Sequence, residues 1–143
     1  MFDNRIKIGI TQGDINGIGW EVILKSFADP MMVELCTPVI YGNRKAAEFY
    51  AATLSEEFEP IHFYFCTSAA EARYGAVNFV EVGDKDLKIE PGKATEVSAK
   101  AAIAALEASV ADLEAGELNA VVTAPISKEG MNAVGFEIGR AHV

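Results

Sequence analysis

The sequence predicts an α/β fold in which a mostly parallel sheet is flanked by helices. Short apolar runs that are typical of buried strands alternate with longer runs that have helical spacing. The glycine-rich turn at residues 12–19 joins the first strand directly to the first helix, as at the start of a parallel α/β unit. A chain of 143 residues is long enough for one domain with its own core.

Five short apolar runs are predicted to be strands, and the segments between them supply the helices. The strands are residues 6–11, 37–42, 61–66, 77–82 and 119–123, and we expect the last to be buried. Helices are predicted over about 17–27, 44–54 and 93–115, with short helical segments at 31–36, 69–74 and 127–133. Asn43 suits the N-cap of the second helix, and Gly116 suits the end of the third. Residues 83–92 are polar and predict a loop.

The clearest helix, residues 93–115, carries apolar residues at steps of three and four. These residues are Val97, Ala101, Ile103, Leu106, Val110 and Leu113. Such a stripe is typical of the face that a helix packs against a sheet. We therefore interpret it as core, with a dimer interface as the alternative.

The charge and composition of the chain exclude several classes of function. A formal net charge of −9 argues against nucleic acid as a partner. No apolar run approaches the roughly 20 residues that cross a bilayer, and no signal peptide precedes the first strand. We therefore expect no membrane partner and a cytoplasmic location.

Cysteine and histidine are scarce in this chain. Cys36 and Cys66 lie in apolar surroundings, so we expect buried free thiols and no disulfide. The histidines are His62 and His142 alone, and there is no Cys-x-x-Cys motif, so a transition-metal site within the chain is not expected. We interpret His62 as an ordinary, partly exposed residue on a strand.

The glycine-rich turn has the chemistry of a ligand site. Gly13, Gly17 and Gly19 allow positive φ and let backbone N–H groups approach a ligand, and the helix that follows directs its positive dipole end at the same place. Phosphate or carboxylate suits such a turn. Asp14 repels an anion, so we expect it either to accept a hydroxyl or a metal-bound water, or to cap the helix. A turn with no ligand at all is the alternative, because this glycine spacing matches neither the dinucleotide nor the Walker motif.

A second turn, residues 123–130, follows the last predicted strand. Thr123, Ser127 and Lys128 are therefore expected at the same edge of the sheet as the glycine-rich turn, and Pro125 stiffens the backbone between them. A lysine at a helix start opposes the helix dipole. This unfavourable position suggests that Lys128 neutralises a substrate phosphate or carboxylate, although a solvated surface lysine is the alternative.

Taken together, the two turns resemble the 4-hydroxythreonine-4-phosphate dehydrogenase family, the PdxA-type enzymes of pyridoxal phosphate synthesis. Residues 11–21, TQGDINGIGWE, are similar to the motif T-x-G-D-P-x-G-I-G-P-E, and residues 123–128, TAPISK, are similar to T-A-P-I-x-K. Ile15 and Trp20 stand where the family has proline, so the entry to the first helix is expected to differ. The resemblance extends over about residues 6–137.

The resemblance implies an isocitrate/isopropylmalate dehydrogenase-like fold, of which this chain would form part, and a homodimer. It implies NAD-dependent oxidation, with decarboxylation, of 4-phosphohydroxy-L-threonine, a small phosphorylated amino acid, assisted by a divalent metal (Zn, Mg or Co). Asp14 and Lys128 are the candidate catalytic residues. The candidate cleft residues are Thr11, Gly13, Gly17, Gly19, Glu21, Thr123 and Pro125.

The sequence departs from the family near its end. The family continues after Gly-Phe into Gly-His-Thr-Glu and then into a part that carries three metal-binding histidines, whereas here residues 137–143 read EIGRAHV. We therefore interpret residues 1–137 as the amino-terminal portion of such a dehydrogenase and 138–143 as a non-native or divergent tail. We expect this portion to bind neither metal nor NAD and to be inactive alone. The alternatives are a phosphate- or nucleotide-binding module without catalysis, a dimerisation module, or a dehydrogenase of another phosphorylated hydroxy acid.

Overall fold

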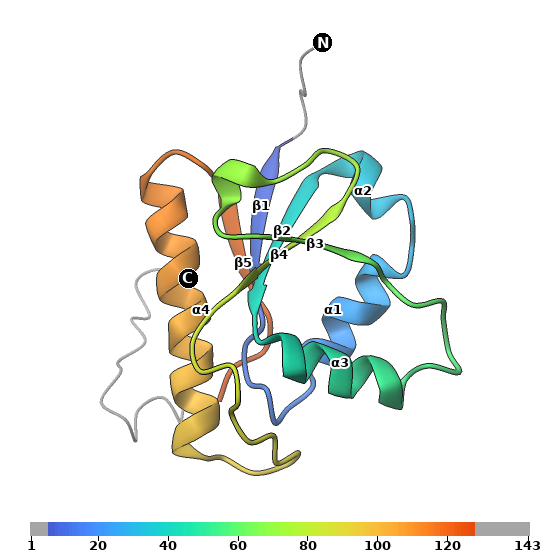
Figure 1. Ribbon diagram of the computed structural model, residues 1–143, viewed down its shortest axis with the longest axis vertical. Coiled ribbons are helices and arrows are strands. Elements are labelled where there is room, and N and C mark those ends of the chain that lie inside the picture. The colour runs from blue at the N-terminus through green and yellow to red at the C-terminus, as the bar shows by residue number, and fades with distance from the viewer. Residues whose placement is uncertain (1–5, 128–143) are drawn as a thin grey trace.

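A computed structural model of the chain describes residues 6–127 and shows a five-stranded parallel sheet (Figure 1). The strand order is β3-β4-β2-β1-β5, and every neighbouring pair is parallel. The strands are β1 (Lys7–Thr11), β2 (Thr37–Gly42), β3 (Phe63–Cys66), β4 (Val77–Glu81) and β5 (Ala120–Thr123). All five lie where the sequence predicts a strand, so the predicted fold class is confirmed.

Helices cover both faces of the sheet (Figure 1). One face carries α4 (Glu96–Glu114), which contacts β1, β2 and β5. The other carries α1 (Gly19–Phe27), α2 (Met32–Leu35) and α3 (Arg44–Thr53), and a 3₁₀ turn, η1 (Ala69–Glu71), precedes β4. Asn43 caps α3 as predicted, because its side-chain oxygen accepts the N–H of Ala46 at 2.8 Å.

The helices on the two faces of the sheet contribute side chains of different size to the core. Between the sheet and α1 and α3, the core contains large residues such as Trp20, Ile40 and Phe79, with the Trp20 and Phe79 rings stacked 5.8 Å apart. Beneath α4 the helix contributes mostly alanine and serine. Small side chains allow the helix backbone to lie close to the strands.

The predicted apolar stripe of α4 is therefore largely wrong. Ala101 is buried as expected, but Val97, Val110 and Leu113 are exposed, and Ile103 and Leu106 are half-buried. The buried face consists of Ser98, Ala99, Ala101, Ala102, Ala105 and Ser109. The reason is steric: a shallow gap above the sheet accepts methyl and hydroxyl groups, so the larger side chains lie on the flank and outer surface.

The prediction that β5 is buried is also wrong. Strand β5 is the edge strand beside β1, and Val122 is 54% exposed because none of the helices within residues 6–127 fully covers the face of β5 on the side of α1. An apolar hollow of about 290 Å³ lies there between α1, β1 and β5, lined among others by Ile10, Phe27 and Val122. An edge strand has a neighbour on one side only, so burial is incomplete.

Other sequence predictions have mixed outcomes. Cys36 and Cys66 are both free thiols, but Cys66 is only partly buried. His62 is exposed just before β3. The predicted short helix over 127–133, His142 and the 138–143 tail lie outside the described residues. Within residues 6–127, none of the helices is both long and apolar enough to cross a membrane.

Candidate functional site

The glycine-rich turn and the second turn meet at the carboxyl ends of β1 and β5. These strands pair in register with Thr11 opposite Thr123, so the chain leaves both strands at the same level. The Asp14 N–H donates to the Pro125 carbonyl at 2.9 Å, and the Ala124 N–H donates to the Thr11 carbonyl at 3.1 Å. Ligands of parallel sheets collect at this edge. We refer to the glycine-rich turn, residues 12–19, together with residues 123–127 of the second turn as the floor of the candidate site.

Two of the glycines are required by close backbone contacts. Gly13 has φ +68°, and a Cβ there would lie 2.3 Å from the Pro125 carbonyl oxygen. At Gly19 a Cβ would lie 2.3 Å from the carbonyl oxygen of Gln12. Neither position accepts a side chain without backbone movement, so both glycines serve the packing of the turn.

Asp14 is partly exposed at the floor, as a ligand-binding carboxylate would be, but it does not cap the helix. Its side-chain Oδ1 accepts the N–H of Asn16 at 3.0 Å, so the chain's own carboxylate occupies one of the donors that a phosphate would need. It does not cap α1, because the N-cap residue is Ile18, which makes no side-chain capping bond. The Asp14 side chain remains partly exposed, and a carboxylate in this position can accept a ligand hydroxyl.

Gln12 is a residue that supports the floor and that the sequence reasoning missed. Its side chain is fully buried, and its Oε1 accepts both the Trp20 Nε1–H at 3.1 Å and the Asn43 N–H at 2.9 Å. Its Nε2 donates to the carbonyl of Ala101 in α4 at 3.3 Å. One amide thus ties the floor to α1, to the start of α3 and to α4.

Tyr50 holds the floor from α3. Its hydroxyl donates to the carbonyl oxygen of Ile15 at 2.5 Å. The pKa of Tyr50 is raised, first because burial disfavours the phenolate and second because the Asp14 carboxylate is close. The Tyr50 hydroxyl is therefore protonated, and available as a donor, throughout the physiological pH range.

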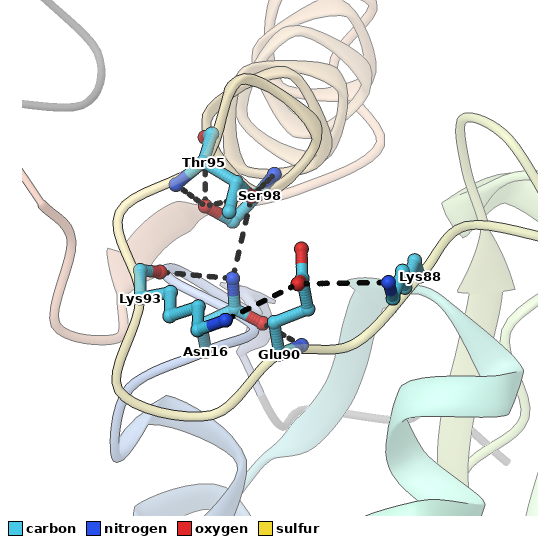
Figure 2. Close-up of polar contacts among 6 residues, drawn as sticks. All are labelled: Asn16, Lys88, Glu90, Lys93, Thr95 and Ser98. Atoms are coloured by element: carbon cyan, nitrogen blue, oxygen red, sulfur yellow. Dashed lines mark hydrogen bonds and ion pairs between the residues drawn. The ribbon is translucent and has the colours of Figure 1, made fainter.

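Asn16 joins the floor to a second segment, residues 83–95, which we call the wall (Figure 2). Its Nδ2 donates to the Lys93 carbonyl at 2.9 Å and to Thr95 Oγ1 at 3.4 Å, and its Oδ1 accepts the Glu90 N–H at 2.7 Å. The Asn16 carbonyl accepts the Gly92 N–H at 2.7 Å. The wall therefore lies directly against the glycine-rich turn, although about 75 residues separate them in sequence.

The wall contains three charged side chains, Lys88, Glu90 and Lys93, and the carboxylate forms an ion pair with each lysine. The Glu90 carboxylate lies 3.7 Å from both Lys88 Nζ and Lys93 Nζ, and Figure 2 shows the three side chains side by side. The wall ends at the N-terminus of α4 in a capping box. There Thr95 Oγ1 accepts the Ser98 N–H at 3.0 Å, and Ser98 Oγ accepts the Thr95 N–H at 3.2 Å.

The remaining predicted site residues differ in their surroundings. Thr11 is buried, and its Oγ1 is the buried side-chain oxygen that lacks a hydrogen-bond partner among the described residues. Thr123 and Pro125 are exposed at the floor, and Gly17 lies against Asp14. Glu21 lies one helical turn from Lys25, with 3.7 Å between their charged groups, so the structure shows it in a surface ion pair. Lys128 lies outside the described residues, and its role stays a prediction.

The described residues do not fit a resident metal ion. Within 6–127, no three His, Cys, Asp or Glu side chains come close enough together to hold one. The chemistry that this part of the chain offers is a rigid, glycine-lined floor, a partly exposed carboxylate and a lysine-bearing wall. These features define an α/β domain with a candidate ligand site at the carboxyl ends of β1 and of the edge strand β5.

Comparison with known proteins assigns the family. The sequence model of the pyridoxal phosphate biosynthetic protein PdxA matches residues 34–141, which is more than half of the chain. The chain therefore belongs to the PdxA family, as the resemblance of the two turns indicated.

Individual relatives agree with this assignment. The chain is 43% identical over 136 residues to 4-hydroxythreonine-4-phosphate dehydrogenase of Bacteroides thetaiotaomicron, covering 95% of this chain and 36% of the relative. It is 32% identical over 139 residues to D-threonate 4-phosphate dehydrogenase of Cupriavidus necator, covering 96% and 41%. A crystal structure of 4-hydroxythreonine-4-phosphate dehydrogenase from Burkholderia phymatum superimposes with a TM-score of 0.81 at 28% identity, over 97% of this chain and 42% of that one. The chain thus spans about two-fifths of the length of these proteins.

Proposed function

We propose that this chain forms the glycine-turn portion of a dehydrogenase that oxidises 4-phosphohydroxy-L-threonine with NAD, in the synthesis of pyridoxal phosphate. The observation that carries the proposal is the direct contact between the two family motifs, in which Asp14 N–H binds the Pro125 carbonyl at 2.9 Å. Both named relatives are dehydrogenases of a phosphorylated hydroxy acid. The metal ion and most of the NAD site would be supplied by residues outside this chain.

Within that enzyme, the residues of this chain would shape and orient the substrate site. Asp14 would accept a hydrogen bond from a substrate hydroxyl, because its carboxylate is partly exposed at the floor. Gly13 and Gly19 let the floor pack without side chains. Lys128, which follows the floor directly, would neutralise the substrate phosphate or carboxylate.

A chimera tests the proposal. The matching segment of the Bacteroides thetaiotaomicron relative, 36% of its length, would be replaced by this chain, and NAD reduction would be followed with 4-phosphohydroxy-L-threonine and a divalent metal. We expect turnover by the chimera and none by the 143-residue chain alone. A folded chimera that oxidises no phosphorylated hydroxy acid contradicts the proposal. Turnover by the chain alone contradicts its expected inactivity.

The same assay separates the substrates. The Cupriavidus necator relative is named for D-threonate 4-phosphate, so that compound is the second substrate to test. A higher kcat/KM for D-threonate 4-phosphate than for 4-phosphohydroxy-L-threonine would change the substrate assignment and leave the reaction class intact. Metal-independent binding of either compound by the chain alone, with an inactive chimera, would favour a binding module.

Lys128 and Asp14 are tested in the chimera one at a time. We expect Lys128→Ala to lower kcat/KM by about 10²-fold or more, because an uncompensated substrate charge is left in the site. Lys128→Arg, which keeps the charge, is the matched control. Unchanged turnover and unchanged KM in Lys128→Ala would contradict its role. The corresponding pair for Asp14 is Asp14→Asn and Asp14→Glu.

A further inference from the structure

We propose that Asn16 is a positioning residue: it locks the wall, residues 83–95, onto the glycine-rich floor so that the two sides of the site hold one geometry. The side chain is only 3% exposed, although asparagine is usually found at the surface. This inference rests on the proposed function for what the site does. The lock itself is a property of the chain that is measured without any activity.

The hydrogen-bonding capacity of the Asn16 side chain is used on both its nitrogen and its oxygen. The amide nitrogen donates to Lys93 O at 2.9 Å and Thr95 Oγ1 at 3.4 Å, and the oxygen accepts from Glu90 N at 2.7 Å (Figure 2). A side-chain carboxylate accepts but does not donate, and a leucine does neither. Only an amide of this length therefore satisfies a backbone donor and a backbone acceptor of the wall together.

The backbone of Asn16 connects the same lock to Asp14. The Asn16 N–H binds Asp14 Oδ1 at 3.0 Å, while its carbonyl receives the Gly92 N–H at 2.7 Å. The candidate catalytic carboxylate and the wall are thus attached to one residue. A displacement of the wall would be transmitted to the orientation of the Asp14 side chain.

The two halves of the wall are held by different residues. Its first half is fixed by Asn43 Nδ2, which donates to Asp84 O at 3.0 Å, and by Lys45 Nζ, which donates to Leu87 O at 3.2 Å. The buried Leu87 side chain anchors the same half in the core. The second half, from Glu90 to Thr95, is held by hydrogen bonds to Asn16. This division supplies a matched control, because Lys45→Ala removes a contact to the first half alone.

Amide hydrogen exchange of the purified chain tests the lock. We expect Asn16→Ala to raise exchange at the Glu90 and Gly92 amides by about tenfold or more. Glu90 N–H loses its acceptor, Asn16 Oδ1, and Gly92 N–H, whose acceptor is the remaining Asn16 carbonyl, loses the side-chain bonds that hold the segment around it in place. Strand amides of β1 and β2 should change less than twofold. In Lys45→Ala, the Glu90 and Gly92 amides should exchange as in the unchanged chain. Unaltered exchange at these two amides in Asn16→Ala, or a uniform increase over the whole chain, would overturn the proposal.

A pH profile of Asn16→Asp distinguishes the lock from ordinary packing. The new carboxyl has nearly the shape of the amide but donates a hydrogen bond only when protonated. Its pKa should be raised by the neighbouring Asp14 carboxylate. Protection of Glu90 and Gly92, corrected for intrinsic exchange, should match the unchanged chain at pH below this pKa and fall as pH rises through it. A protection that is low and independent of pH in Asn16→Asp would also overturn the proposal.

The chimera extends the test to the reaction. We expect Asn16→Asp to lose kcat/KM as pH rises through the same interval, whereas the chimera with Asn16 does not. If every chimera is inactive, the proposed function fails and the exchange experiment still decides whether Asn16 locks the wall. If the chimera is active and its Asn16→Asp profile is unchanged, Asn16 does not position the site.

Discussion

The two ends of the floor differ in how completely the described residues support them. At the glycine-rich turn, Gln12, Asn16 and Tyr50 reach the backbone of four separate segments by hydrogen bonds of 2.5 to 3.3 Å. At β5, Val122 is 54% exposed and an apolar hollow of about 290 Å³ lies beside it. The glycine-rich turn is thus built from contacts within the chain, whereas β5 leaves apolar surface that another surface can cover. How firmly a site residue is held therefore depends on its hydrogen bonds and packing contacts as well as on the motif to which it belongs.

Loss of Trp20 should have the largest effect at the well-supported end. Trp20 is fully buried, stacks on Phe79 and donates to Gln12, so Trp20→Ala leaves a large cavity and removes one of the two hydrogen bonds that Gln12 Oε1 accepts. We expect a loss of about 3–5 kcal/mol in the free energy of unfolding, measured by urea denaturation. Val122→Ala at the open end is the control and should cost about 0.5 kcal/mol or less. Equal losses for the two variants would contradict the comparison.

Gly13→Ala should come next, because it combines φ strain with a backbone clash. A Cβ at Gly13 would lie 2.3 Å from Pro125 O, whereas at Gly75, with φ +79°, no atom lies within 4 Å. Gly75→Ala therefore measures φ strain alone, about 1 kcal/mol, and Gly13→Ala should cost about 2–4 kcal/mol by denaturation. If the two variants are equally stable, the backbone at Pro125 moves to accept the Gly13→Ala methyl group, and the floor is less rigid than its contacts indicate.

Tyr50→Phe should have a smaller, pH-dependent effect. Near neutral pH, loss of the bond to Ile15 O should cost about 1 kcal/mol. The folded-state pKa of Tyr50 lies above its ordinary value of 10, so its contribution is fully present below pH 10 and is lost as pH rises through the folded-state value. The stability difference between the two chains, measured by denaturation at pH 7 to 11, should therefore shrink above pH 10. A difference that grows with pH contradicts this.

Val122→Lys should have the smallest effect on folding and the clearest effect on association. The side chain is exposed on an edge strand, so the free energy of unfolding should change by about 0.5 kcal/mol or less. We expect the unchanged chain to self-associate through the uncovered β5 face, and a lysine there to weaken that association. Sedimentation velocity over a concentration series checks this. If the unchanged chain is monomeric at every concentration, the β5 face does not mediate self-association.

The elements of this fold were predictable because each one has a local signal. Strand β2 was predicted at its observed bounds, and Asn43 was recognised as a cap from its place before a helical run. Burial was predicted less well. The α4 stripe failed because periodicity identifies a face but not the depth of the gap that it fills, and β5 failed because an apolar run does not show whether its strand lies at an edge.

The candidate site was predictable only where its residues form motifs. The two turns carry recognisable glycines, prolines and threonines, and the structure brings them together between neighbouring strands. Gln12, Asn16 and Tyr50 were missed because their partners lie far away in sequence, 89 residues in the case of Gln12 and Ala101. Buried polar side chains that bind distant backbone groups leave no periodic pattern, so they become visible only in three dimensions.

The place of β1 in the strand order has a consequence for how the chain is made. One neighbour of β1, β2, is synthesised soon afterwards, but the other, β5, follows so late that the bond from Lys7 N to Asn119 Oδ1 spans 112 residues. At a synthesis rate of about 5–20 residues per second, one edge of β1 waits roughly 6–22 s for its partner. During this interval the edge of β1 that later pairs with β5 is open to solvent. The nascent chain is therefore most exposed to mispairing at the strand that later carries the floor of the site.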